Sequence, residues 1–386
     1  MVQSVPMNNT NKPFSIFYTI NFLYNSAMNN LPSLSRIPGE YAIDIIDQTL
    51  LPHRYQRITI QSLEEIVSAI NGMQVRGAPL IGIAAAYGMA LAMLEECDDN
   101  AVHNAYAMLL ATRPTAVNLR WALDKVITEL LTIPPDERVG RAFVLADQML
   151  ADDIEACRQI GEQGITVINV VAKIKQSTIN ILTHCNAGSL AVVAWGTALA
   201  PIYLAHQQGV DVHVWVDETR PRNQGSSLTA WELQQRGVPY TVIADNVGGH
   251  LMQSNRVDMC MVGADRISRD GYVCNKIGTY LKALAARANN VPFYVAAPTS
   301  TIDWEMQGDR VTIEERDGDE LRKVRGRNSV GEIIEVELFD SSSPVANYGF
   351  DVTPPHLVSA IITELGIASA DEQGLAIQKS LLKDIR

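Results

Sequence analysis

The chain is poor in cysteine, with single residues at positions 97, 157, 185, 260 and 274 of 386. Their number is odd, their spacing is wide and no Cys-x-x-Cys pair occurs, which excludes a disulfide framework and a structural zinc site of the usual spacing. Free cysteines of this kind are typical of a reducing compartment, so we expect a cytoplasmic protein. No run of about 18 apolar residues occurs, so we expect no membrane-spanning helix.

Basic residues are also fewer than acidic residues. The sequence has 31 Lys and Arg against 43 Asp and Glu, which gives a formal net charge of −12. An acidic chain without a basic patch does not favour nucleic acid or an anionic membrane as a partner.

The motifs that indicate common cofactors are missing. There is no Gly-x-Gly-x-x-Gly after a strand, no phosphate-binding Gly-x-x-x-x-Gly-Lys-Ser/Thr, no His-Glu-x-x-His and no Gly-x-Ser-x-Gly. We therefore expect no dinucleotide, nucleoside triphosphate or metal cofactor.

What the chain does have is an ordinary globular composition, with 47% hydrophobic and 19% charged residues. Its length suits two domains. Residues 1–30 are rich in Asn and contain one Lys and no Arg, whereas a secretion signal begins with a basic segment. We expect a disordered extension over residues 1–35, with Met28 as an alternative start; a signal peptide is the other interpretation.

Residues 36–165 are expected to form a mostly helical domain with a small β element. The stretch 41–60 alternates in hydrophobicity and predicts a hairpin or small sheet. From residue 62 to about 161 the apolar residues recur with a helical period, and Pro114, Pro134 and Pro135 separate the helices.

The pattern changes near residue 178, where apolar strand-like runs begin to alternate with helical stretches. The runs are INILTH, VDVHVWVD, YTVIAD, VDMCMVGA and VPFYVAAP. This alternation predicts βαβ units, and the nearly continuous apolar strands predict a parallel sheet covered on both faces. Residues 166–386 are thus expected to form a Rossmann-like, doubly wound α/β domain.

Ligands of open α/β sheets bind beyond the carboxyl ends of the strands. The residues at or directly after the carboxyl ends of the five runs are Cys185, Asp217 with Glu218, Asp245, Asp265 and Pro298. Several reactive groups at one edge indicate an active site. Acidic residues at such positions also cap helices. For Glu218 and Asp245 a capping role and a role in an active site are equally good interpretations.

Cys185 lies in THCNAGSLAVVAWG, which predicts a strand, a turn and a helix. A thiol at a helix N-terminus has its thiolate form favoured by the helix dipole. The alternative is an inert buried cysteine, which is what we expect of the other four. His184 precedes Cys185 on an extended strand and should point to the opposite side, so Asp265 is the better placed partner.

A second group of residues indicates phosphate binding. Arg76 and Gly77 lead into a helix with Pro79 in its first turn; free amides and an arginine at such a position bind phosphate. Arg113 and Lys276 occur in similar settings. An ordinary capped loop is the alternative interpretation for each segment taken alone.

Eight segments follow one another along the chain: VRGAPLIGIAAAYG, TRPTAVNL, THCNAGSLA, VWVDETRPRNQGSSLTAWEL, VGADRI, NKIGTY, PFYVAAPTSTID and FDVTPP. In this order they resemble the methylthioribose-1-phosphate isomerase family of methionine salvage, from about Arg36 to Gly366. The wider family also includes ribose-1,5-bisphosphate isomerases and regulatory subunits of a translation-initiation exchange factor.

The resemblance implies a cofactor-free conversion of 5-methylthioribose 1-phosphate to 5-methylthioribulose 1-phosphate by a homodimer. It implies that Cys185 and Asp265 are catalytic, with Asp265 as the proton donor. The substrate-binding residues that it implies are Arg76, Gly77, Ala78, Arg113, Gln224, Asn275 and Lys276.

The sequence departs from the family's pattern around VANYGF, where a Pro-Ala pair is usual, and at three single positions. Ser227 stands where Arg is usual, and Tyr272 and Cys274 stand where Asp and Ala are usual. Tyr272 is close in sequence to Asn275 and Lys276 and so bears on substrate range.

Two alternative functions stay open from sequence. An isomerase of ribose 1,5-bisphosphate would need further cations for the second phosphate. A non-catalytic regulatory subunit would be expected to lose Cys185 and Asp265, and both are present.

Overall fold

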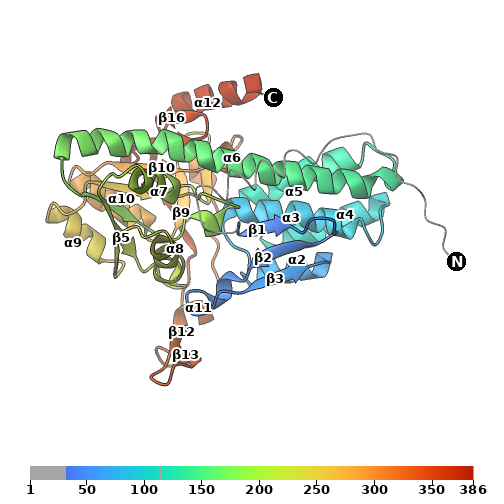
Figure 1. Ribbon diagram of the computed structural model, residues 1–386, viewed down its shortest axis with the longest axis horizontal. Helices are drawn as coiled ribbons and strands as arrows, with labels where there is room; N and C mark the ends of the chain where they lie inside the picture. Colours follow the sequence, from blue (N-terminus) through green and yellow to red (C-terminus); the bar gives the residue numbers. More distant parts are fainter. Residues whose placement is uncertain (1–31, 114, 386) are drawn as a thin grey trace. The chain divides into compact units, whose positions relative to one another are not determined.

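The structure is a computed structural model that describes residues 32–113 and 115–385 (Figure 1). The predictions for residues 1–30 therefore lie outside the described residues. Within the described ranges, no helix combines the length and the apolar character needed to cross a membrane. All five cysteines are free thiols.

The first half is helical with a small sheet, as predicted. Strands β1 (Leu34–Arg36), β2 (Ile43–Ile46) and β3 (Arg57–Ile60) form an antiparallel sheet in that order. The helices are α2 (Leu63–Asn71), α3 (Ala78–Ala92), α4 (Asp99–Thr112), α5 (Val117–Leu130) and α6 (Pro135–Lys175). Ser62 and Asp98 cap the starts of α2 and α4 with their side-chain oxygens.

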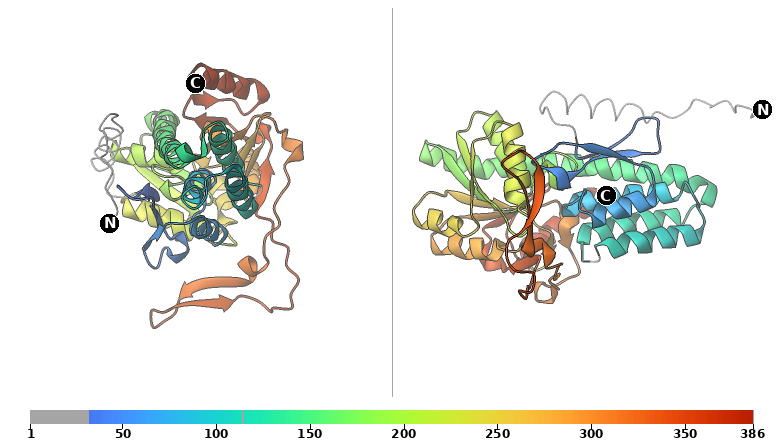
Figure 2. Two further views of the ribbon diagram at one scale, coloured as in Figure 1. Left: turned by 90° about the vertical axis from the view of Figure 1, so that its right-hand side faces the viewer. Right: turned by 90° about the horizontal axis from the view of Figure 1, so that it is seen from below.

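Helix α3 is the centre of this half. All of its residues are buried, and it packs against α2, α4, α5 and α6 (Figures 1 and 2). Its small side chains allow close approach: a Cβ on Gly82 would lie 2.7 Å from the carbonyl oxygen of Asn118 on α5. Helix α6 continues beyond α3 to pack against α7 and the large sheet, so the boundary predicted at residues 165–166 falls inside one helix.

The second half contains a seven-stranded sheet in the order β16-β15-β10-β7-β4-β5-β6. The strands are β4 (Ile179–Thr183), β5 (Val212–Asp217), β6 (Tyr240–Ile243), β7 (Met259–Val262), β10 (Phe293–Ala296), β15 (Ala360–Thr363) and β16 (Gly366–Ala368). All pairs are parallel except β15 with β16. The predicted α/β class with a parallel sheet is confirmed.

The strand order places a topological switch point in the middle of the sheet. Numbered along the chain, the six parallel strands run 3-2-1-4-5-6, the doubly wound order. The chain leaves β4 toward β5 on one side and returns through β7 on the other, so β4 and β7 are neighbours. Ligands bind at this point in such sheets.

Helices cover the large sheet. Helices α6 and α7 (Leu199–Gln207) pack together and against its strands, and α9 (Val247–Gln253) and α10 (Thr279–Ala288) form a second packed pair (Figure 1). Between β5 and β6 runs a π-helical turn, η3 (Gly225–Thr229), that continues into α8 (Ala230–Gln235).

Smaller elements complete the chain. A four-stranded sheet has the order β11 (Ile302–Asp303), β8 (Arg266–Ser268), β9 (Val273–Lys276) and β14 (Phe350–Thr353). Strands β12 (Lys323–Arg327) and β13 (Ile333–Glu337) form a hairpin that extends from the body in Figure 1, beside α11 (Asp319–Arg322). Helix α12 (Glu372–Ile385) ends the described chain. The short 3-10 turns are η1 (Gln48–Leu50), η2 (Ser189–Ala191), η4 (Thr299–Thr301), η5 (Gly308–Arg310) and η6 (Pro355–Leu357).

The helix predicted directly after Cys185 is wrong for residues 192–198. Only the turn η2 forms there, and α7 begins at Leu199. Distant groups take the backbone bonds that a helix would need: the Val193 amide donates to Asp153, and its carbonyl accepts from Ser33. Gly196 has φ +98°, which a helix does not allow.

The Asp153 carboxylate that holds this loop makes stability depend on pH. Burial raises its pKa to about 7, whereas an exposed aspartate has 3.8. The folded state therefore binds a proton that the unfolded chain releases, and the free energy of unfolding falls as pH rises from about 4 to about 7.

We predict that Asp153→Asn removes this decline, because an amide stays neutral and can still accept from Val193. The stability of the variant relative to wild type should rise by up to about 4 kcal/mol between those pH values. Urea unfolding across pH measures it, with the exposed neighbour Asp152→Asn as control. A pH-independent difference for Asp153→Asn would contradict the account.

Candidate active site

A cleft opens where β4 and β7 end, at the switch point of the sheet. It is lined by all nine residues singled out in the sequence, namely Arg76, Gly77, Ala78, Arg113, Cys185, Gln224, Asp265, Asn275 and Lys276. The first four come from the helical half of the chain and the others from the second half. The structure thus brings these residues together, while their individual roles stay predictions.

Cys185 follows β4 in a turn that is fixed on both sides. Its backbone has φ +66°, and its amide donates to the Thr219 hydroxyl at 2.8 Å. Its carbonyl accepts from the Thr229 hydroxyl at 2.7 Å. The thiol then lies 3.4 Å from the side-chain oxygen of Gln224, the residue before η3. A thiol held in this way has one orientation, toward the cleft.

The expectation of a stabilised thiolate is not met by this turn. No α-helix begins directly after Cys185, because α7 starts only at Leu199, so the predicted helix dipole is missing at the thiol. Burial raises the pKa of the Cys185 thiol; the nearby Lys276 and Arg76 oppose that shift and Asp265 adds to it. The protonated thiol is the favoured form.

Asp265 follows β7, the neighbour of β4, and its amide donates to the Cys274 carbonyl at 3.0 Å. Burial raises the pKa of its carboxyl group, and the cations Lys276, Arg113 and Arg76 oppose the shift. A buried carboxyl group with a raised pKa is suited to act as a proton donor. The cleft therefore places a thiol and a carboxyl group, both with pKa values that burial raises, within electrostatic reach of each other.

Cations from both halves of the chain surround these two acids. Lys276 on β9 donates to the Gly349 carbonyl at 3.0 Å and lies 4.9 Å from the centre of the Phe350 ring. Burial lowers the pKa of Lys276, and it also lowers the pKa of Arg113. Arg113 is 3.6 Å from the Glu314 carboxylate, and its Nε has no hydrogen-bond partner among the described residues. It can therefore donate to an anion in the cleft.

Arg76 joins the helical half to the Cys185 turn. Its guanidinium donates to the side-chain oxygen of Asn186 and, at 3.0 Å, to the Asn186 carbonyl. The Asn186 amide donates onward to Glu232, a fully buried carboxylate that also accepts from the amides of Ser189 and Leu190. The arginine expected to bind phosphate thus also fixes the residue after Cys185.

Gly77, Ala78 and Asn275, which also line the cleft, each have a structural role. A Cβ on Gly77 would lie 2.4 Å from the Ala191 carbonyl oxygen, and its φ is +94°. Ala78 begins α3. Asn275 on β9 donates to the Thr279 hydroxyl at 3.0 Å and so joins β9 to the start of α10.

Sequence patterns missed several residues of the cleft, among them Arg222, Arg316 and Phe350. Arg316 lies on the loop before α11 and bonds to Glu314 at 2.9 Å and Glu320 at 2.7 Å. No local spacing marks these residues, because tertiary structure alone brings them to the cleft.

The three departures from the family pattern lie in different places. Tyr272 packs against Gly308 and is not among the residues that line the cleft. The Ser227 hydroxyl bonds to the Asn223 carbonyl at 2.6 Å, away from the cleft. Cys274 does line it, and burial raises its pKa to about 12.

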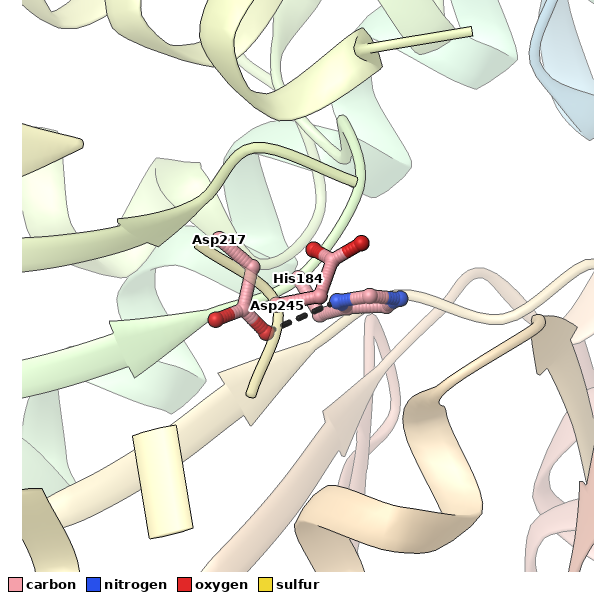
Figure 3. Close-up of side chains that lie close together, drawn as sticks. All are labelled: His184, Asp217 and Asp245. Carbon is pink, nitrogen blue, oxygen red and sulfur yellow. Dashed lines mark hydrogen bonds and ion pairs between the residues drawn. The ribbon is translucent and has the colours of Figure 1, made fainter. Parts of the chain in front are cut away.

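A second cluster includes His184, the residue before Cys185 (Figure 3). His184, Asp217 and Asp245 have ligand atoms close enough to hold a metal ion. The ammonium of Lys282 is 3.0 Å from Asp217 and donates to the Asp245 carbonyl, so a cation of the chain itself neutralises this group. Both oxygens of the Asp245 carboxylate accept backbone amides, from Thr219 and Arg220. Asp217 and Asp245 thus serve the structure of the site from behind the cleft.

The fold and the cleft define an α/β protein with a cleft lined by cations at the switch point of its sheet. Comparison with known proteins gives the family: the sequence profile of the Initiation factor 2 subunit family matches residues 74–370. The chain belongs to this family.

Its relatives include a methylthioribose-1-phosphate isomerase from Methylorubrum populi, 54% identical over 340 residues, which are 88% of this chain and 93% of that protein. The crystal structure of a 5-methylthioribose 1-phosphate isomerase from Pyrococcus horikoshii has a TM-score of 0.79 and 34% identity, covering 92% of this chain and 98% of that one. That of translation initiation factor eIF-2B, subunit delta, from A. fulgidus has a TM-score of 0.72 and 38% identity, covering 88% and 96%.

The contact between Gly77 and Ala191 predicts that Gly77→Ala strongly destabilises the protein. The new Cβ meets backbone rather than a movable side chain, and the backbone is left-handed. We expect the free energy of unfolding to fall by at least about 3 kcal/mol. Urea unfolding measures this loss. Gly39→Ala is the matched control, because Gly39 has φ +81° and nothing within 4 Å. Equal losses in the two variants would mean that the contact with Ala191 costs nothing.

Proposed function

We propose that the chain is an aldose–ketose isomerase that converts 5-methylthioribose 1-phosphate to 5-methylthioribulose 1-phosphate in methionine salvage. One observation carries the proposal: two half-buried acids, Cys185 and Asp265, share a cleft with cations from both halves of the chain. The relatives' names support the choice of substrate.

The substrate's chemistry explains why acids are needed. Its anomeric carbon is a phosphate ester, so no free aldehyde is available. The bond between C1 and the ring oxygen must break while the phosphate stays on C1, and hydrogen must then move from C2 to C1. The carboxyl group of Asp265 supplies the proton that the departing ring oxygen takes up. The Cys185 thiol exchanges a proton at the C1–C2 unit.

The cations hold the phosphate in place. Arg76, Arg113 and Lys276 bind its oxygens together with the amides at the start of α3, where Gly77 and Ala78 lie. Gln224 and Asn275 bind the sugar hydroxyl groups. Fixing the phosphate orients C1 and C2 between the two acids and resists loss of the phosphate group.

No cofactor or metal takes part in this scheme. Redistribution of hydrogen within one substrate needs no external oxidant or reductant. The proposed setting is the cytoplasm, where the five cysteines stay reduced.

Assay of purified protein with 5-methylthioribose 1-phosphate by phosphorus and proton NMR tests the function. Ribose 1,5-bisphosphate is run beside it, because Arg222 and Arg316 add cations to the cleft, although Glu320 pairs with both. A ketose 1-phosphate from the first substrate alone, with or without EDTA, is the expected result. Turnover of the bisphosphate alone would reassign the substrate, and no turnover from folded protein would favour a regulatory relative.

Cys185→Ser and Asp265→Asn are each expected to lower kcat at least about 100-fold, because each removes a group that exchanges a proton with the substrate in this scheme. Unfolding curves like those of wild type would show that the fold is intact. Cys260→Ser, which alters a buried thiol on β7 that does not line the cleft, is the control. Normal kcat in either cleft variant would refute its catalytic role.

We further propose that the chain is a homodimer through its second half. Helix α10 supports this, because Tyr280, Leu281 and Leu284 leave 36%, 61% and 39% of their surface exposed on one short helix. A second copy of the chain is the occupant that the resemblance implies.

Sedimentation equilibrium of wild type should give twice the chain mass. Leu281→Glu should shift the protein toward monomer, because a charge would be buried at the contact. Leu131→Glu, at an exposed position in the helical half, should leave the mass unchanged. A monomeric wild type, or an unaffected Leu281 variant, would remove this interface.

A further inference from the structure

His184, the residue before Cys185, is buried and bridges two separate elements. Only 1% of its surface is exposed. Its Nδ1 is 2.8 Å from Oδ2 of Asp217 at the end of β5, the contact drawn in Figure 3. Its Nε2 is 2.8 Å from the carbonyl oxygen of Ile277, which follows Lys276. The imidazole therefore connects the end of β4 with the turn that carries Lys276.

The two partners of the ring require two protons on it. A peptide carbonyl oxygen can only accept a hydrogen bond, so Nε2 must donate to Ile277. The Asp217 oxygen that faces Nδ1 also accepts from the Lys282 ammonium at 3.0 Å and is therefore an acceptor, so Nδ1 donates to it as well. A neutral imidazole has one N–H and satisfies one of these contacts.

We propose that His184 is an imidazolium that positions Cys185 against Lys276. It makes no hydrogen bond to the Cys185 thiol, whose partner is Gln224, so its effect is through geometry. The kinetic part of this proposal rests on the isomerase activity proposed above. The part that concerns the protonation of the ring stands on the hydrogen bonds alone.

The turn after Lys276 fits closely over the imidazole. Gly278 has φ +102°, and a Cβ there would lie 3.0 Å from Cε1 and 3.1 Å from Nε2 of His184. On its other side the turn is held by Asp351, whose carboxylate accepts from the amides of Gly278 at 2.7 Å and Tyr280 at 3.1 Å. A side chain at position 278 would therefore push the turn off the ring, and Asp351 holds the turn from its other side.

The position of this turn matters because Lys276 interacts with both acids of the cleft. The lysine ammonium opposes the rise in pKa of Cys185 and of Asp265. A shift of the turn by about 1 Å would change this electrostatic balance and the distance to the substrate, and such misplacement can cost about 100-fold in rate.

The protonation of the ring is tested in wild type, and a variant serves only to assign the signals. Solid-state NMR of protein labelled with ¹⁵N-histidine, with His184→Gln to assign the signals, reads the two ring nitrogens separately. We expect both to carry a proton. An unprotonated Nδ1 or Nε2 on His184 would overturn the proposal.

The positioning role is tested by kinetics in two variants that act from opposite sides of the contact. His184→Gln can donate to only one partner, and Gly278→Ala pushes the turn off the ring. We expect each to lower kcat by about 10- to 100-fold and to change KM by less than about threefold. Both effects should appear in protein whose unfolding curve shows a folded state.

Two controls match these variants. His213→Gln alters a half-buried histidine at the start of β5, and Gly209→Ala has φ +81° with nothing within 4 Å. Both should keep the kcat of wild type. Wild-type kcat in folded His184→Gln, or a loss confined to KM, would contradict the positioning role. If wild type itself turns over neither substrate, the proposed function fails, and the NMR result still decides the state of His184.

Discussion

Exclusion of water from ionisable groups at the switch point is the constraint on which the site depends. Burial raises the pKa values of Cys185 and Asp265 and lowers those of Arg76 and Lys276. In each case charges of the other groups oppose the effect of burial. Two acids whose pKa values burial raises therefore stand beside cations in one cleft. A phosphorylated sugar that must accept a proton on its ring oxygen fits this combination.

Contacts between the two halves of the chain produce that burial. Gly77 lets the start of α3 rest on Ala191, and Arg76 reaches across to Asn186 beside Cys185. The Glu232 carboxylate accepts hydrogen bonds from the backbone amides of Ser189 and Leu190, which follow the Cys185 turn. The same contacts that close the cleft thus set the direction of the thiol. The fixed turn and the burial of the charged groups are two results of one packing arrangement.

The parallel sheet and the position of the cleft could be predicted from the sequence, because both follow from local patterns of apolar residues. The alternation of apolar strands and helices gave the parallel sheet, and the rule for strand ends selected Cys185 and Asp265. Long-range bonds decided what the patterns missed. Residues 192–198 have a helical pattern, yet Asp153 and Ser33 hold Val193 in a loop. Arg316 enters the cleft from a loop whose spacing carries no signal, and the two-sided contact of His184 requires knowing that Ile277 lies opposite Asp217.

The protonated state of the Cys185 thiol at neutral pH is the claim on which the account of the cleft depends most directly. An infrared difference spectrum of wild type minus Cys185→Ser isolates the S–H stretching band of that thiol from those of the other four cysteines. The account predicts a band at pH 7 that persists up to at least about pH 9, because burial raises the pKa above the ordinary value of 9.0. Absence of the band at pH 7 would mean that Cys185 is a thiolate and would contradict it.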